Sequence, residues 1–563
     1  MGLRRWGPAL AAGERAGCVV SARGAERPGA EAEGPWSCSG VLLSRRAGLV
    51  LCHGGIVAPF LRSGVAALQP GAGPPFLGAD SCRDDLRLQV QWGPGRGPGA
   101  PAGQWGELCT PPCSAQPAPR GPDRARLLLL VSCPAFRASF ACLFGGEAAE
   151  QWRFAGGGPE PPAPPQEPEA EAGAWAEEGP LLAALGWFAL LSVEGRAEAA
   201  GGPRLAVAAA ASLPKGAPLL ACGSPFGAFC PDIFLNSVSR GVLSNAAGPL
   251  LLTDARCLPG TEGAGVFSAD GELVALVAAP LCWRAREWVG LSLLCAADAL
   301  LRAAAHAMGR LDRPADARLL AALLPPEDGE AVIPLPEHGA AWVAAVLVEC
   351  GSVWGSGVAL TPRLVLTCRH VAPREAKRVL VRPATLKSSP VWGKVVFATQ
   401  DTSPYDVAVV KLEENLSGIP FPVLASHFHE GEDVQVVGFG AFGQACGPSV
   451  TSGILSAVVE VNDAPVMLQT TCAVHGGSSG GPLFTGSGEL LGIVTSNARD
   501  NSTGATYPHL NFSIPITVLE PALDQYRRTG DLHRLRELDR PGEQVRVVWR
   551  LQRVLAEPPR SKL

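Results

Sequence analysis

A serine in a glycine-rich turn is the residue of this chain whose surroundings point most clearly to chemistry. Residues 477–482 read GSSGGP, and Ser479 is the serine that precedes the two glycines and the proline. A serine hydroxyl is a poor nucleophile unless a base takes its proton and donors hold the oxyanion formed on attack. Glycines permit a tight turn in which the N–H groups of Gly477 and Ser479 point at one negative charge. These residues form a candidate nucleophile loop, in which Ser478 is the competing hydroxyl.

A histidine and an aspartate lie earlier in the same part of the chain, each beside an apolar run. The segment LVLTCRH ends in His370, and the segment YDVAVVKL carries Asp406 at its start. An imidazole titrates near neutral pH and can act as a general base. A carboxylate beside it orients the ring and stabilises the imidazolium without taking the proton. We therefore predict a catalytic triad of His370, Asp406 and Ser479, with Asp401 close enough to compete as the carboxylate.

Strands are the elements that must bring these residues together. The surrounding sequence consists of short runs rich in Val, Leu and Ala, bounded by Gly, Pro, Asn and Asp, as at residues 434–438, 490–495 and 512–516. This spacing is typical of antiparallel β-barrels or sandwiches. The chain order His, Asp, Ser is that of chymotrypsin-like folds and differs from the orders in subtilisins and α/β-hydrolases.

The N-terminal part of the chain repeats the C-terminal blocks in the same order. Residues 39–43 (SGVLL) echo residues 356–360 (SGVAL), and residues 263–274 (GAGVFSADGELV) lie against residues 480–491 (GGPLFTGSGELL). Collinear blocks of this kind indicate two copies of one structural unit. The alternative is an unrelated N-terminal domain whose glycine-rich strands look alike.

The first copy lacks all three residues of the predicted triad. The registered positions of the base, the carboxylate and the nucleophile hold Gly55, Trp187 and Glu262, in that order. His53 lies near the base position but two residues early. A carboxylate cannot replace the serine in acyl transfer. We therefore expect an inactive copy that acts as a structural or substrate-presenting partner.

The blocks around the triad resemble the trypsin-like serine proteases of the HtrA/Deg type. The resemblance implies an all-β fold of tandem trypsin-like double β-barrel units, the first degenerate and the second catalytic. The residues after the protease domain are too few for a PDZ domain. We expect the following division: 1–310, a degenerate protease-like domain with an acidic, proline-rich insertion at 155–180; 311–339, a linker; 340–526, the protease domain; and 527–563, a C-terminal tail.

The chain ends in Ser561, Lys562 and Leu563, the tripeptide read by the peroxisomal import receptor. This ending narrows the resemblance to peroxisomal proteases that remove N-terminal targeting leaders from imported proteins and process some fatty-acid β-oxidation enzymes. The resemblance implies a serine endopeptidase of the peroxisomal matrix, with leader-bearing matrix enzymes as its protein substrates. A general quality-control protease and a catalytically silent protease-like scaffold are the alternatives.

The specificity pocket is predicted to be uncharged. In a trypsin-like barrel the residue six before the nucleophile lies at the bottom of the pocket for the side chain that precedes the cleaved bond, and that residue is Ala473. We therefore expect no preference for Lys or Arg, and the resemblance suggests cleavage after cysteine. This raises the hypothesis of self-processing in residues 107–115, at Cys109 or at Cys113.

Composition excludes several other classes of protein. With 47 basic and 52 acidic residues and a net charge of −5, nothing favours nucleic acid or an anionic membrane surface. The most apolar stretch, residues 179–193, is shorter than the roughly twenty residues that a bilayer needs.

The 17 cysteines follow no secretory start, which suggests reduced thiols. Cys109 with Cys113, and His427 with His429, lack further zinc ligands, so we expect no metal and no cofactor. The sequence leaves open whether the chain forms a homo-oligomer.

Overall fold

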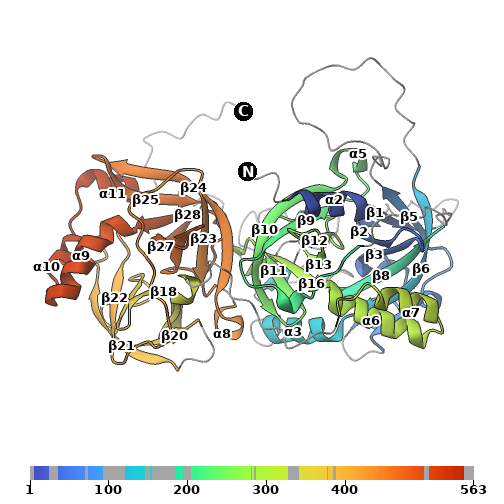
Figure 1. Ribbon diagram of the computed structural model, residues 1–563, viewed down its shortest axis with the longest axis horizontal. Helices are drawn as coiled ribbons and strands as arrows, with labels where there is room; N and C mark the ends of the chain where they lie inside the picture. The colour runs from blue at the N-terminus through green and yellow to red at the C-terminus, as the bar shows by residue number, and fades with distance from the viewer. Residues whose placement is uncertain are drawn as a thin grey trace, which may run out of the picture.

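The chain folds into two halves that lie side by side, each built from two β-barrels (Figure 1). The first half precedes residue 327 and the second follows residue 340. This computed structural model describes residues 6–24, 36–69, 74–92, 121–145, 152–154, 184–194, 205–280, 282–284, 287–326, 341–376, 378–384, 389–440, 442–499 and 506–550. The expected all-β fold of tandem double barrels is confirmed.

The first half contains barrels 1 and 2. In barrel 1, β6 pairs with both β5 and β8 and so closes the ring, and the short β4 (Phe76–Gly78) pairs with β6 outside it. The ring strands are β1 (Gly17–Arg23), β2 (Trp36–Ser44), β3 (Leu49–His53), β5 (Arg87–Trp92), β6 (Asp123–Ser132) and β8 (Trp187–Val193). Barrel 2 contains β9 (Pro218–Gly223), β10 (Ser237–Ala247), β11 (Leu250–Thr253), β12 (Gly265–Ser268), β13 (Leu273–Ala279) and β16 (Ser292–Ala296).

The second half contains barrels 3 and 4, which carry the predicted triad. Barrel 3 consists of β17 (Ala345–Cys350), β18 (Val353–Thr361), β19 (Leu364–Thr367), β20 (Val379–Pro383), β21 (Val391–Ala398) and β22 (Ala408–Leu412). Barrel 4 consists of β23 (Asp433–Gly438), β24 (Ser449–Val461), β25 (Ala464–Thr470), β26 (Pro482–Thr485), β27 (Leu490–Arg499) and β28 (Thr506–Pro515).

Helices cover the barrels and fill the space around them. In the described residues they are α2 (Gly7–Ala16), α3 (Pro134–Phe144), α5 (Pro231–Phe234), α6 (Ala297–Arg310), α7 (Pro314–Ala321), α8 (Gly443–Cys446), α9 (Ile516–Thr529), α10 (His533–Glu537) and α11 (Glu543–Trp549). Helix α6 packs on β6, β13 and β16, and α7 packs on α6. None of these helices has both the length and the apolar composition to cross a membrane.

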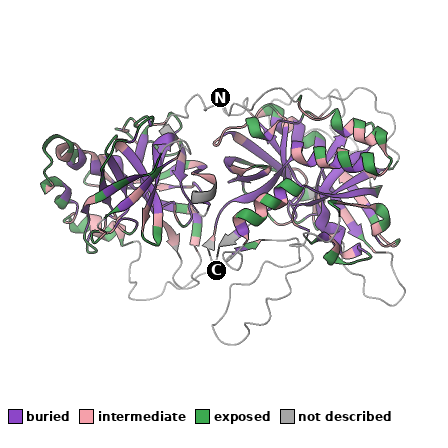
Figure 2. Cartoon of the chain, turned by 90° about the horizontal axis from the view of Figure 1, so that it is seen from below, coloured by how far each residue is buried: buried purple, intermediate pink, exposed green. Residues whose placement is uncertain are grey.

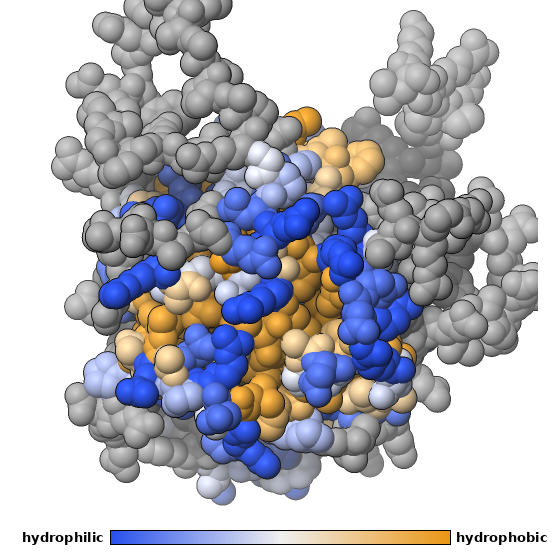
Figure 3. Space-filling model, turned by 90° about the vertical axis from the view of Figure 1, so that its right-hand side faces the viewer, coloured by the Kyte–Doolittle hydropathy of each residue, from blue (hydrophilic) through white to orange (hydrophobic). Residues whose placement is uncertain are grey.

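Each half has its own hydrophobic core inside and between its barrels (Figure 2). Strands such as β19 are buried along their whole length, whereas β22 exposes only Lys411. Val, Leu and Ala dominate these strands because a barrel interior requires apolar residues that fit a pleated surface. The end of the molecule formed by barrel 1 shows apolar side chains between hydrophilic ones (Figure 3).

The two halves are joined by a polar contact between β10 and β24 and by an aromatic cluster. Asn245 of β10 donates to Ser449 Oγ at 3.0 Å, and Lys215 donates to the carbonyl of Pro448 at 2.8 Å. Burial lowers the pKa of the Lys215 ammonium to about 8. Phe442, which precedes α8, packs on Trp152 with ring centroids 5.3 Å apart. Trp152 belongs to a small sheet of β7 (Trp152–Phe154), β14 (Cys282–Arg284) and β15 (Glu287–Trp288).

Candidate active site

Strand pairing places His370 and Asp406 at the same end of barrel 3. β19 is antiparallel to β22, with Thr367 opposite Ala408, so the residues that follow β19 lie beside those that precede β22. His370 Nδ1 and Asp406 Oδ2 are 2.5 Å apart. The backbone N–H of His370 donates to Asp406 Oδ1 at 3.1 Å. Both carboxylate oxygens therefore hold the histidine, and Nε2 of the imidazole stays available for another group.

The surroundings of Asp406 keep its carboxylate ionised. Burial alone would raise the pKa of Asp406, but hydrogen bonds from His370, the His370 charge and the guanidinium of Arg369 outweigh burial and lower it below its usual value. Arg369 Nε lies 3.9 Å from Asp406 Oδ1 and 3.4 Å from Asp401 Oδ1. The Asp401 side chain is fully exposed and, within the described residues, makes no hydrogen bond or ion pair with His370. The geometry thus separates the two candidate carboxylates.

Ser479 lies on the neighbouring loop between β25 and β26. Its carbonyl oxygen accepts a hydrogen bond from the N–H of Ser356 at 2.9 Å. A Cβ on Gly480 would lie 3.0 Å from the backbone nitrogen of Cys368, two residues before His370, so this loop touches the end of β19. The Ser479 hydroxyl donates to the carbonyl of Thr495 at 3.5 Å. Within the described residues, no hydrogen bond joins that hydroxyl to His370.

Among the described residues, three amides of the serine loop donate hydrogen bonds and two have no acceptor. The N–H groups of Ser478, Gly480 and Gly481 donate to backbone carbonyls at 2.7–3.0 Å. The N–H groups of Gly477 and Ser479 have no hydrogen-bond acceptor in the part of the chain that the structure describes. Two free amides on one turn are what binding of an oxyanion requires.

Gly477 is at a position that no other residue fits. Its φ is +92°, a conformation that side chains disfavour, and a Cβ there would lie 2.4 Å from the Trp354 ring. Ser356 fixes the same turn from barrel 3, because its hydroxyl donates to the Gly477 carbonyl at 2.7 Å and accepts from the Phe439 N–H at 2.7 Å. Sequence reasoning did not identify Trp354 or Ser356 as site residues. The Ser-Gly-Val block, which both copies of the repeat contain, was the signal that could have identified Ser356.

The C-terminal helices hold the loop that leads into Asp406. The Ser403 hydroxyl donates to the carbonyl of Leu538 at 2.7 Å, and the Tyr405 ring packs edge-on against Trp549 with centroids 5.8 Å apart. The predicted tail of residues 527–563 thus includes α10 and α11, which fold onto the second half.

Cys368, His370 and Asp406 place three donor atoms within 4.8 Å of one another. These donors do not fit a metal ion well. The Cys368 thiol is buried and bonded to the Val494 carbonyl at 3.3 Å, and burial raises its pKa well above the usual value, whereas a metal needs a thiolate. The other two donors are already paired with each other.

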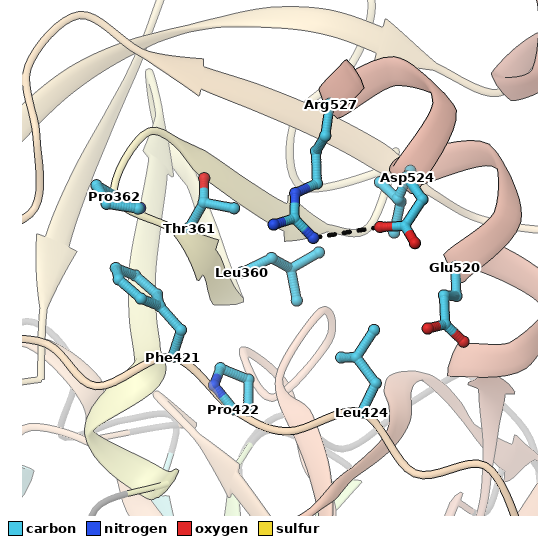
Figure 4. Close-up of a pocket in the computed structure, with 10 residues that line it drawn as sticks. Leu360, Thr361, Pro362, Phe421, Pro422, Leu424, Glu520, Asp524 and Arg527 are labelled. Atoms are coloured by element: carbon cyan, nitrogen blue, oxygen red, sulfur yellow. Dashed lines mark hydrogen bonds and ion pairs between the residues drawn. The ribbon is translucent and has the colours of Figure 1, made fainter. Parts of the chain in front are cut away.

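A separate hollow of about 320 Å³ lies on the second half between the end of β18, residues 421–424 and α9 (Figure 4). An Asp524–Arg527 ion pair at 3.2 Å borders it. None of its lining residues belongs to the triad or the serine loop. It is therefore not the active-site cleft.

The first half carries the same loop with Glu262 in place of the serine. The N–H of Ser39 donates to the Glu262 carbonyl at 3.0 Å, as that of Ser356 donates to Ser479. Gly260 has a φ of +92°, the value found at Gly477. The other two positions follow from the strands, because β3 pairs with β8 as β19 pairs with β22. Gly55 and Trp187 stand where the sequence register places them.

The Glu262 side chain binds the amide that corresponds to a predicted oxyanion donor of the second half. Its Oε2 accepts from the N–H of Gly260 at 2.8 Å, and this amide corresponds to that of Gly477. Glu262 Oε1 and His53 Nε2 are buried and have no partner in the described part of the chain. Burial raises the pKa of Glu262 to about 7 and lowers the pKa of His53 to about 4. Burial therefore shifts both groups toward their neutral forms.

Glu262→Gln is expected to remove a pH-dependent loss of stability. Because the pKa rises from 4.5 to about 7 on folding, the folded state binds this proton more tightly than the unfolded state, and stability falls as pH rises from about 4.5 to 7. Between pH 5 and pH 8, we expect the unfolding free energy of wild type to fall by about 2–3 kcal/mol relative to that of the glutamine variant. Urea unfolding at both pH values, in a Ser479→Ala background that prevents proteolysis, measures this. If the difference in unfolding free energy between the two proteins were the same at pH 5 and at pH 8, the prediction would be refuted.

Ala473 lies among the described residues, whereas three other predicted features lie outside them. Ala473 is buried at the base of the serine loop, with 2% of its surface exposed. The other three are the predicted self-processing positions Cys109 and Cys113, the acidic, proline-rich insertion at 155–180 and the C-terminal tripeptide at 561–563.

The chain is similar to one protein family and to several known proteins. A family model described as a trypsin-like peptidase domain matches residues 355–493. The human peroxisomal leader peptide-processing protease is 65% identical, with both chains covered completely. The serine endoprotease DegS of Escherichia coli is 29% identical over 31% of this chain and 49% of its own. A crystal structure of the serine endoprotease from Yersinia pestis is 26% identical, covering 34% of this chain and 68% of its own, with a TM-score of 0.28.

Proposed function

Because the chain belongs to the family of peroxisomal leader peptide-processing proteases, we propose that its second half removes N-terminal targeting leaders from imported proteins. The chain is a serine endopeptidase of the peroxisome. Its proposed substrates are leader-bearing matrix proteins and fatty-acid β-oxidation enzymes. Recognition of Ser561, Lys562 and Leu563 by the import receptor would deliver it to the matrix.

The proposed chemistry is acyl transfer to Ser479. The hydroxyl attacks the scissile carbonyl while His370 Nε2 takes its proton, and Asp406 holds the imidazole through Nδ1. The amides of Gly477 and Ser479 bind the oxyanion. The protonated imidazole then gives its proton to the leaving amine, and water resolves the acyl-enzyme by the reverse sequence.

One observation carries this proposal: the His370–Asp406 pair lies next to a serine loop with two free amides. The Ser479 hydroxyl faces the carbonyl of Thr495, so attack requires rotation of this side chain about its Cα–Cβ bond. Side-chain rotamers interchange in picoseconds to nanoseconds when they are not packed in place. The rotation is therefore not an obstacle to catalysis.

The two halves have different proposed roles. We assign catalysis to residues 340–526 and a non-catalytic role to residues 1–310. Support comes from Gly55, Trp187 and Glu262, none of which can act as base, orienting carboxylate or nucleophile at its position.

Self-processing at Cys109 or Cys113 is part of the proposal. An uncharged pocket with Ala473 at its base can accept a cysteine side chain, and residues 107–115 are rich in proline and cysteine. N-terminal sequencing of purified wild type and Ser479→Ala protein tests this. A fragment that forms only in wild type supports self-cleavage, and the same fragment in both proteins excludes it.

Incubation with a leader-bearing precursor distinguishes processing from general degradation. We expect one cut at the leader boundary, mapped by N-terminal sequencing of the product, and slow or no hydrolysis of unfolded casein. Equal hydrolysis of both proteins at many sites would support a quality-control protease instead. No hydrolysis of either would support a silent scaffold.

A further inference from the structure

By analogy with a trypsin-like barrel, we expect the pocket for the side chain before the cleaved bond to be built around residues 471–474. These residues lead into the serine loop, and in a trypsin-like barrel they form the base of the pocket. Their carbonyls are held by side chains of neighbouring strands: Thr451 Oγ1 donates to Ala473 at 2.8 Å, and Asn497 Nδ2 donates to Val474 at 2.7 Å. The N–H of Val474 donates to the carbonyl of Pro508 at 2.9 Å. Together these segments form the expected wall of that pocket, called the pocket wall below.

The first half contacts this wall from behind. Gly290, which follows β15, is buried, and a Cβ added to it would lie 3.1 Å from Pro508 Cβ and 3.2 Å from Ala473 Cβ. Trp288 of β15 packs edge-on against His509 with ring centroids 5.5 Å apart. Ala473 is accordingly part of the hydrophobic cluster of the first half. A larger residue than glycine would press directly on the base of the pocket.

A buried carboxylate of the first half fixes the strand beside the wall. Asp254 Oδ2 accepts hydrogen bonds from the backbone N–H of Ser452 and from its hydroxyl, the latter at 3.0 Å. Asp254 Oδ1 accepts from the N–H of Val242 at 2.7 Å, so one side chain joins β10 to β24. Ser452 adjoins Thr451, whose hydroxyl holds Ala473. The contact between the halves is thus continuous with the pocket wall.

We propose that the degenerate half is a part of the specificity pocket, with Gly290 and Trp288 as residues that position its rear wall. The inference rests on the proposed role of Ser479 and adds a reason for a protease to keep an inactive copy of itself. A pocket backed by a second domain has its size fixed by residues far from the catalytic loop in sequence. Side chains behind the wall then set which substrate residue fits.

Gly290→Ala is expected to make the enzyme prefer smaller side chains. The added methyl lies at 3.1–3.2 Å from two wall residues, so the wall moves toward the pocket. The measurement uses two peptides that differ only in alanine or leucine before the cleaved bond. We expect the kcat/KM ratio of alanine to leucine peptide to rise about tenfold, the size of effect that one methylene has in such a pocket. Trp288→Ala removes the ring that packs on His509, whose Nδ1 lies 3.1 Å from the Thr471 carbonyl of the wall, and is expected to move the ratio in the opposite direction.

Gly64→Ala is the matched control. Gly64 also belongs to the first half and has a φ of +63°, close to the +74° of Gly290, but a Cβ there meets open space. It places a methyl group on another glycine of positive φ in the same half without the contact, and its alanine-to-leucine ratio should equal that of wild type. The rate of labelling by a small alkyl fluorophosphonate, which leaves the pocket empty, should stay within about twofold in all variants.

The outcomes separate this inference from the proposed function. If wild type is not labelled at Ser479, the proposed function fails. If labelling is intact and the peptide ratio is the same in wild type, Gly290→Ala and Trp288→Ala, only the pocket inference is overturned. Should Gly290→Ala not fold, Trp288→Ala decides alone, because loss of a partly buried ring leaves the backbone of the wall unstrained.

Discussion

Ser479→Ala is expected to lower kcat/KM for a leader-bearing substrate by about 10⁴-fold or more. The variant keeps the fold, the His370–Asp406 pair and the amides of the loop but has no atom that can form the acyl-enzyme. In serine proteases, loss of the nucleophile costs about as much as loss of the whole triad, because the three residues act as a unit. The measurement is cleavage of the purified precursor under single-turnover conditions, with circular dichroism to check the fold.

Ser478→Ala is the matched control for this variant. Ser478 is adjacent and buried, and its backbone N–H donates to the carbonyl of His475 at 3.0 Å. The substitution keeps that bond and removes only a neighbouring hydroxyl. We expect activity within a few-fold of wild type. If Ser478→Ala were the inactive variant and Ser479→Ala the active one, the assignment of the nucleophile would be wrong.

Asp406→Asn is expected to lower kcat by about 10⁴-fold at neutral pH, with a smaller effect on KM. Asparagine fits the same space, but its amide group donates to the imidazole where the carboxylate accepted. The ring then takes the tautomer that protonates Nε2, and Nε2 can no longer remove the serine proton. Steady-state kinetics on a peptide substrate measure the change.

Asp401→Asn is the control that separates the two carboxylates. Asp401 shares Arg369 with Asp406 but is fully exposed, so its loss should change kcat by no more than about twofold. The lowered pKa of Asp406 also has a consequence for pH. Its stabilising contribution is complete above the usual value of 3.8 and is lost only as pH falls through the lowered value. A loss of activity between pH 8 and pH 5 therefore does not come from protonation of Asp406.

The sequence was sufficient to predict the fold and to select the triad candidates. His370 and Asp406 each adjoin a short apolar run, and antiparallel pairing of these runs brings their ends together. The repeat placed Gly55, Trp187 and Glu262 opposite the triad, because strand register is preserved between copies even where the chemistry is lost. The choice of triad candidates and the register of the two copies both depend on local sequence patterns and on the order of these patterns along the chain.

Contacts between distant segments could not be predicted in the same way. Arg369 is adjacent to His370 in sequence, yet only the fold shows that it reaches Asp406. The packing of Trp549 on Tyr405 joins a segment that sequence alone sets apart as a tail. The contact of Gly290 with Ala473 joins the two halves. Neither residue of such a pair belongs to a motif or a periodic pattern, so the sequence gives no sign that the two residues meet.

Peptide mapping of the fluorophosphonate adduct tests the central claim most directly. Purified full-length protein is labelled, digested and analysed by mass spectrometry, with His370→Ala protein treated in parallel. We expect a single adduct on Ser479 in wild type and at least a hundredfold slower labelling in the variant, because an unactivated hydroxyl reacts poorly. An adduct on Ser478, or labelling of Ser479 that is equally fast without the imidazole, would contradict the account.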